Sequence, residues 1–77
     1  MHMTKVQRQK HIDAINSLLE QNGYGLNRYG KYQNGDISID TREINFKVTR
    51  GDFKLYSKPM TFITIDEVQR LIERWNV

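Results

Sequence analysis

The sequence has no cysteine among its 77 residues, which excludes both a disulfide framework and a thiolate metal site. It has a single proline, Pro59, and no apolar run that approaches the roughly 20 residues of a transmembrane helix. No signal-peptide pattern is present either. We therefore expect a protein of the cytoplasm, a reducing compartment, with no membrane partner.

Strong charge of one sign is also absent, because the net charge is only +3. A balance this mild does not by itself mark a nucleic-acid-binding protein. The excess is concentrated in residues 42–58, where two carboxylates, Glu43 and Asp52, accompany five cations. These cations are Arg42, Lys47, Arg50, Lys54 and Lys58. The basic character therefore belongs to one segment of the chain.

The length and composition fit one small globular domain, since 38% of the residues are hydrophobic and 27% are charged. Met1-His2 ahead of Met3 resembles a cloning scar, so we expect a single domain over residues 3–77. A chain of this size buries only about 60% of the surface that its unfolded state exposes. A deep active site would compete with the core for the same apolar residues, which argues against an enzyme.

Two segments show the periodicity of amphipathic helices. Thr4–Asn22 carries an apolar stripe at helical spacing and ends at Asn22-Gly23, a typical stop signal. Its stripe consists of Ile12, Ile15, Leu18 and Leu19. The second helix begins at Thr64-Ile65-Asp66-Glu67, which matches a capping box. Its apolar face follows at i, i+3, i+4 and i+7, with Val68, Leu71, Ile72 and Trp75.

The middle of the chain alternates between apolar and polar residues with a period of two, as half-buried strands do. Asn34-Gly35 predicts a tight turn into Ile37–Asp40, and Arg50-Gly51-Asp52 predicts a second turn. Pro59 should end the last strand. The side chains expected to point inward are Tyr24, Leu26, Ile37, Ile39, Ile44, Phe46, Val48, Phe53 and Leu55.

The predicted fold class is therefore α+β, with the order helix, three or four antiparallel strands, helix. Each helix has one apolar stripe and the sheet has one apolar face, so both helices should pack on the same face of the sheet. The other face is then left to water, and it is the expected location of function.

Polar side chains on this free face form the candidate site. The alternation places Asn45, Lys47, Thr49, Lys54, Tyr56 and Lys58 there, and Tyr29 and Lys31 join them if residues 24–33 form a strand. Lysines around a tyrosine can bind phosphates or an acidic protein surface. The alternative interpretation is a solvated face whose lysines prevent edge-to-edge aggregation. The predicted partner-binding residues are Tyr29, Lys31, Lys47, Thr49, Lys54, Tyr56 and Lys58.

A catalytic or metal site has little basis in the residues. Asp40 and Asp52-Phe53-Lys54 resemble the D…D-x-K pattern of a metal-dependent nuclease family, which would imply a Mg²⁺ site with Lys54 orienting water. Asp52, however, falls in a predicted turn. His11 has no partner at ligand spacing. We expect no catalytic residue, no metal and no cofactor.

The order of elements is similar to that of two families. It resembles double-stranded-RNA-binding domains, which place lysines at the start of their last helix, whereas Asp66 and Glu67 occupy that turn here. Element order and size also look like small phage-encoded inhibitors, including anti-CRISPR proteins that occupy a DNA-binding surface of a Cas nuclease. The DNA mimics among these are strongly acidic, which this chain is not.

These observations lead to two functional hypotheses. The first is a non-catalytic accessory or inhibitor protein of a phage or mobile element, which docks through its free sheet face on a host protein or protein–nucleic-acid complex. The alternative is direct binding of DNA or RNA through the same face. The sequence does not define the oligomeric state.

Overall fold

The computed structural model describes residues 3–75, so Met1 and His2, interpreted above as a cloning scar, lie outside the described residues. The elements are α1 (Lys5–Gln21), β1 (Gly25–Leu26), β2 (Tyr32–Asn34), β3 (Ile37–Asp40), β4 (Asn45–Arg50), β5 (Phe53–Pro59) and α2 (Ile65–Trp75). This order confirms the α+β class with a helix at each end of an antiparallel sheet. Neither described helix is long and apolar enough to cross a membrane.

The sheet has five strands in the order β1-β2-β3-β4-β5, with every neighbouring pair antiparallel. The prediction of three or four strands was wrong. β1 has only two residues, and a strand this short shows no alternation from which it could be predicted. Each strand pairs with the next one in the chain, so the connections between them are short.

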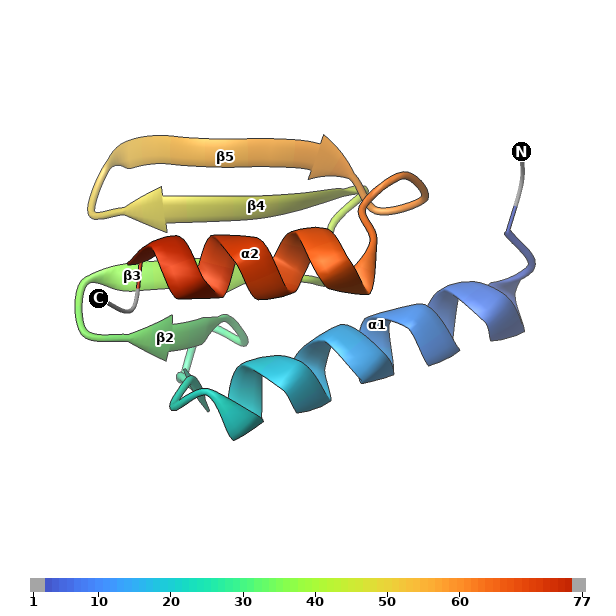
Figure 1. Cartoon of the computed structure of the whole chain (residues 1–77), viewed down its shortest axis with the longest axis horizontal. Coiled ribbons are helices and arrows are strands. Elements are labelled where there is room, and N and C mark those ends of the chain that lie inside the picture. The colour runs from blue at the N-terminus through green and yellow to red at the C-terminus, as the bar shows by residue number, and fades with distance from the viewer. Residues whose placement is uncertain (1–2, 76–77) are drawn as a thin grey trace.

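Both helices pack on one side of the sheet, and the chain termini leave from opposite ends of the molecule (Figure 1). The helices contribute three buried side chains each, Ile12, Ile15 and Leu19 from α1 and Val68, Leu71 and Ile72 from α2. They contact inward side chains of the strands and loops: Tyr24, Tyr32, Ile37, Ile39, Phe46, Val48, Met60 and Ile63. Among residues 3–75, no helix covers the other side of the sheet.

Helix α1 has well-formed ends. Thr4 and Gln7 form a complete capping box, in which each side chain accepts a hydrogen bond from the other residue's backbone N–H. At the C-terminus, Gly23 N–H donates to Glu20 O and Tyr24 N–H donates to Leu19 O, the pattern of a Schellman motif. Gly23 adopts φ +88°, so the predicted stop at Asn22-Gly23 is confirmed.

The two predicted hairpin turns have the same construction. Gly35-Asp36 joins β2 to β3, one residue later than the predicted Asn34-Gly35, because Asn34 pairs with Ile37. Gly51-Asp52 joins β4 to β5, and φ is +60° at Gly35 and +57° at Gly51. Positive φ at the first central residue alone is typical of a type II′ turn. Both turns lie at the same end of the sheet, where Arg50 Nε lies 3.4 Å from Asp36 Oδ2.

Strand β5 contains a β-bulge that changes which side chains face the helices. Thr49 pairs with Lys54 and Val48 pairs with Tyr56, so Leu55 has no partner of its own. Beyond Leu55 the alternation is reversed. Phe53, predicted to point inward, is 76% exposed at the end of the hairpin, and Leu55 is half-buried.

Two other predicted core residues are also exposed. Ile44, 79% exposed, lies in the β3–β4 connection just before β4 begins. Leu26, 63% exposed, lies in β1 at the edge of the sheet. In both cases the prediction applied the period-two alternation to a residue outside the part of the sheet that the helices cover.

Candidate binding face

The face of the sheet opposite the helices, here called the open face, carries mostly polar side chains. Residues paired across antiparallel strands share a face, and Tyr32, Ile39 and Val48 form one buried row of such pairs. The intervening rows therefore point away from the helices. They consist of Gln33, Ser38, Thr49 and Lys54 in one row, Asp40, Lys47 and Ser57 in the next, and Asn45 beyond.

Three of the predicted site residues, Lys47, Thr49 and Lys54, lie on this open face as expected. Lys47 and Lys54 are exposed, and Thr49 is half-buried between Ser38 and Lys54. Within residues 3–75, the ion pairs are Arg50–Asp36 and Lys58–Glu67, and neither involves a lysine of this face. The ammonium groups of Lys47 and Lys54 are therefore available to a partner.

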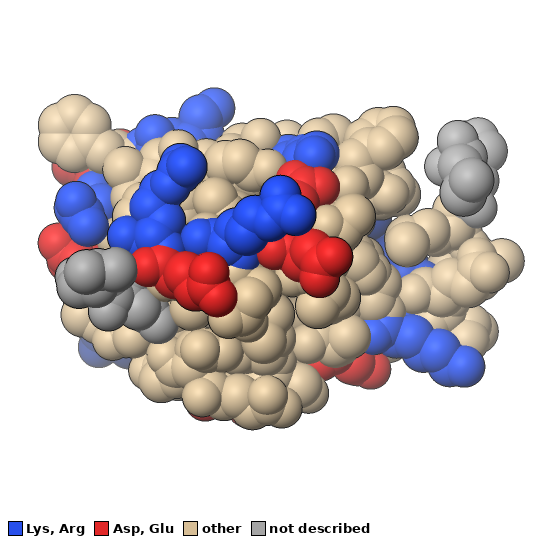
Figure 2. Space-filling view, viewed as in Figure 1, with Lys and Arg blue, Asp and Glu red and all other residues tan. Residues whose placement is uncertain are grey.

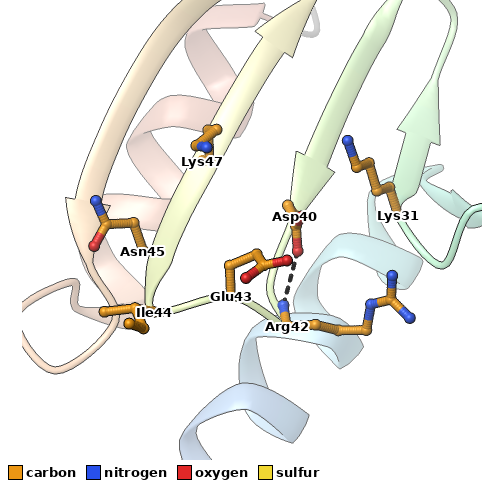
Figure 3. Close-up of a pocket in the computed structure, with 7 residues that line it drawn as sticks. All are labelled: Lys31, Asp40, Arg42, Glu43, Ile44, Asn45 and Lys47. Atoms are coloured by element: carbon orange, nitrogen blue, oxygen red, sulfur yellow. Dashed lines mark hydrogen bonds between the residues drawn. The ribbon is translucent and has the colours of Figure 1, made fainter.

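A depression of about 550 Å³ lies on the open face where β3 ends and β4 begins (Figure 3). Its lining carries both signs of charge, from Lys31, Lys47 and Arg42 on one hand and Asp40 and Glu43 on the other. Asp40 Oδ1 accepts the Arg42 backbone N–H at 2.9 Å, which fixes the turn out of β3. Ile44 and Asn45 complete the lining.

Tyr29 and Lys31, the conditional members of the predicted site, lie in the loop between β1 and β2 rather than in a strand. Lys31 nevertheless lines the depression, so it joins Lys47 across the end of β3 (Figure 3). Tyr29 is exposed, and the Arg42 guanidinium reaches its backbone oxygen at 2.8 Å. Arg42 thus connects the loop to the depression.

Tyr56 and Lys58 do not lie on the open face, and this part of the predicted site was wrong. Because of the bulge, Tyr56 pairs with buried Val48 and Lys58 pairs with buried Phe46, so both point toward the helices. The rings of Tyr56 and Phe46 meet edge to face at 6.3 Å. The expected tyrosine at the centre of the lysine patch is therefore absent from the open face.

Tyr56 and Lys58 instead bind Glu67 in the first turn of α2. Glu67 Oε2 accepts from Lys58 Nζ at 2.6 Å and from the Tyr56 hydroxyl at 3.2 Å. The bond with Lys58 is the main cause that lowers the pKa of Glu67 and raises that of Lys58, while burial is the main cause that raises the pKa of Tyr56.

The Glu67 contacts also modify the predicted capping box of α2. The Thr64 hydroxyl accepts the Glu67 backbone N–H at 3.1 Å, as predicted. The Glu67 carboxylate accepts from the Thr64 hydroxyl instead of the Thr64 backbone N–H.

The structure adds Asp40, Arg42, Glu43 and Ser57 to the site. Asp40 alternates with buried Ile39, so the period-two pattern could have placed it on the open face. Arg42 and Glu43 lie in an irregular connection, where alternation gives no direction. Ser57 was missed because the bulge reverses the pattern after Leu55.

The geometry brings together no metal-binding cluster among residues 3–75. No group of three His, Asp or Glu side chains there could hold a metal ion. Asp40 and Asp52 of the nuclease-like pattern lie at opposite ends of the β3–β4 strand pair. His11 Nε2 lies 2.8 Å from Ile63 O, to which it donates, so its ring joins α1 to the loop before α2.

Charges on the helix-covered side differ in arrangement from those of the open face. Figure 2 shows blue and red side chains next to one another along α2. The ion pair between Lys58 and Glu67 lies on this side of the sheet. On the open face, Lys47 and Lys54 form no ion pair within residues 3–75.

Comparison with protein-family models, curated proteins and solved structures finds no match to this chain. The resemblances to double-stranded-RNA-binding domains and to small phage-encoded inhibitors therefore stay predictions from element order and size. What the chain does is inferred from its own residues.

Proposed function

We propose that this chain is a small non-catalytic binding protein that docks through its open face on a partner protein, alone or within a protein–nucleic-acid complex. The observation that carries the proposal is the row structure of that face. Lys47 and Lys54 lie among the hydroxyl and amide side chains of Ser38, Thr49, Gln33 and Ser57, with Asp40 opposite Lys47, and neither lysine has an ion-pair partner within residues 3–75. Exposed cations in such an arrangement attract an acidic surface.

Two features favour protein over nucleic acid as the partner. Asp40 and Glu43 line the depression beside Lys31 and Lys47, and such a mixture of charges suits a protein surface that carries both signs better than a uniformly anionic phosphate backbone. A stacking platform for bases requires aromatic side chains. Tyr56, the aromatic residue that was predicted for this face, points to the helix side.

The class of protein that best suits this proposal is a phage or mobile-element accessory protein that inhibits a host protein, as anti-CRISPR proteins do. Its support is the size of the chain, the order of its elements and the large free face of the sheet. Such a protein acts by covering a surface of its target, which requires no catalytic group.

Direct binding of DNA or RNA is the second candidate. It is favoured by the same unpaired lysines, together with Lys31 and Arg42 at the depression. Binding of this kind loses affinity steeply as salt rises, because each neutralised phosphate releases a counterion.

A charge-reversal experiment tests the proposal. The variant K47E/K54E reverses the open face, and K5E/K10E reverses the same number of exposed lysines on α1 as a matched control. In affinity capture from a bacterial host lysate, the wild type and K5E/K10E should retain one common protein that K47E/K54E loses. Retention of that protein by K47E/K54E would overturn the proposal.

The same variants distinguish binding to a nucleic acid from binding to a protein. Fluorescence anisotropy with labelled single- and double-stranded 20-mers of DNA and RNA should show no tight binding at low salt. Affinity that falls steeply with salt and disappears in K47E/K54E would replace the proposed protein partner with a nucleic acid.

A further inference from the structure

The loop between β1 and β2, residues 27–31, is held in one conformation by a dense set of hydrogen bonds. Asn27 Oδ1 accepts the backbone N–H groups of Tyr29 at 2.9 Å and Lys31 at 3.0 Å. Asn27 N–H donates to Lys31 O at 2.8 Å, and Gly30 N–H donates to Asn27 O at 3.0 Å. The Asn27 side chain therefore acts as the internal support of the loop.

A second support comes from outside the loop. The Arg42 guanidinium donates to Tyr29 O at 2.8 Å and packs directly over Gly30. Gly30 adopts φ +78°, and a Cβ atom at this position would overlap the guanidinium. The backbone conformation thus favours glycine, and a side chain at this position would also push the Arg42 guanidinium aside.

The Tyr29 side chain is exposed and contacts Arg28. Its ring lies 5.0 Å from the Arg28 guanidinium carbon, and Arg28 Nη2 donates to its hydroxyl at 3.0 Å. The side chain nevertheless remains 65% exposed. A single exposed aromatic is ordinary on a protein surface. An exposed aromatic whose backbone and ring are both held in place is the arrangement of a preorganised binding residue.

We propose that Tyr29 is the aromatic anchor by which this chain inserts into an apolar pocket with an acidic rim on its partner protein. The acidic rim follows from charge, because Arg28 and Lys31 flank the tyrosine and residues 24–35 contain no carboxylate. Tyrosine and arginine are the residue types enriched among binding hot spots. This inference rests on the proposed function in one respect, since it takes the partner to be a protein.

The occupant is a protein rather than a base-stacked nucleic acid because the ring is already covered on one side by Arg28. The other side of the Tyr29 ring, its edge and its hydroxyl remain exposed, and these suit insertion into a pocket. Arg42 also joins this loop to the depression on the open face, so the anchor and the lysines can contact one partner together.

The experiment uses a displayed random-peptide library, panned against the immobilised full chain. The enriched peptides should combine acidic residues with an apolar residue. Their affinity for Tyr29→Ala should fall about tenfold or more, as expected for loss of a hot spot. Phe53→Ala is the control, because Phe53 is also mostly exposed, at the opposite end of the sheet, and its loss should leave the affinity unchanged.

Asn27→Ala tests preorganisation separately, since it keeps Tyr29 and removes the acceptor of two loop amides. It should weaken the same peptides several-fold and speed hydrogen exchange at the Tyr29 and Lys31 amides. Equal peptide affinity in wild type and Tyr29→Ala would overturn the anchor, and so would labelled oligonucleotides that bind through Tyr29.

The panned peptides also separate the two proposals. If they lose affinity only for K47E/K54E, the open face is the docking surface and the loop is not. If they lose affinity only for Tyr29→Ala, the loop binds without the open face.

Discussion

Strands β4 and β5 form one hairpin, yet they relate to the core in different ways. In β4, buried Phe46 and Val48 alternate with exposed or half-buried residues over the whole strand. In β5 the alternation is broken at Leu55, so that Lys54 lies on the open face while Tyr56 and Lys58 lie on the helix side. The difference shows that a period-two pattern fixes the face of a residue only while the pairing register is unbroken.

The position of each strand in the sheet explains why the bulge occurs where it does. β4 pairs on both sides, with β3 and with β5, so an extra residue would disrupt two sets of hydrogen bonds. β5 is an edge strand with one neighbour, where a bulge disrupts only one set and also blunts the exposed edge.

Single-residue deletions should give the largest contrast between the two strands. Removing Lys47 from β4 shifts the register against both neighbours and turns part of the buried row toward water, so this variant should be unfolded under native conditions. Removing Leu55 takes away the residue that has no partner and keeps Tyr56 opposite Val48.

The Leu55 deletion should therefore fold, at a cost of about 1 kcal/mol for the lost contacts of a half-buried leucine. Circular dichroism and urea unfolding measure both variants. A folded Lys47 deletion, or an unfolded Leu55 deletion, would contradict this explanation of the hairpin.

Two phenylalanines provide the next comparison, because both were predicted to be buried. Phe46 in β4 is 0% exposed, so Phe46→Ala should lower the free energy of unfolding by about 3–5 kcal/mol. Phe53 in β5 lies mostly in solvent, so Phe53→Ala should change it by less than about 0.5 kcal/mol. Urea unfolding followed by the fluorescence of Trp75 measures both. Similar losses for the two variants would mean that Phe53 packs in the core.

Most of the fold was predictable because its signals are local. The helix stop at Gly23, the turns at Gly35 and Gly51 and the apolar stripes depend on residues close together in sequence. β1 was not predictable, since two residues show no period. The bulge was not predictable either, because Leu55-Tyr56 places two apolar residues side by side and fits either face.

The candidate site was predictable only in part, for the same reason. Lys47 and Thr49 lie in β4, whose register is regular, and they are placed correctly. Tyr56 and Lys58 follow the bulge and were misplaced. Their true partner, Glu67, belongs to α2, and no local pattern in β5 indicates a contact with a distant helix. Tyr29 depends on Asn27 and Arg42, which only the folded loop brings to it.

The contacts of Glu67 with Lys58 and Tyr56 should make the stability of the protein depend on pH. They therefore test what the inward side chains of β5 contribute. Hydrogen bonding to Lys58 holds the pKa of Glu67 below its usual value of 4.5, so the stability from this carboxylate is present above pH 4.5 and lost as pH falls below it. Lys58 and Tyr56 have pKa values raised above 10.5 and 10.0, so their contributions are lost as pH rises past those values. Stability should therefore be greatest between about pH 5 and pH 9.

Glu67→Gln isolates the acid limb of this profile, because glutamine keeps the shape of the side chain and removes its charge. The variant should unfold at lower urea than the wild type at pH 7, and the difference in midpoint should shrink as pH falls further below 4.5 and the wild-type carboxylate takes up its proton. Glu73→Gln, on the same helix but without an ion pair within residues 3–75, should follow the wild type throughout this pH range. Equal midpoints for Glu67→Gln and the wild type at pH 7 would show that the ion pair between β5 and α2 adds nothing to stability. In that case the bulge would turn Lys58 toward the helices, but the contact with Glu67 would not stabilise the fold.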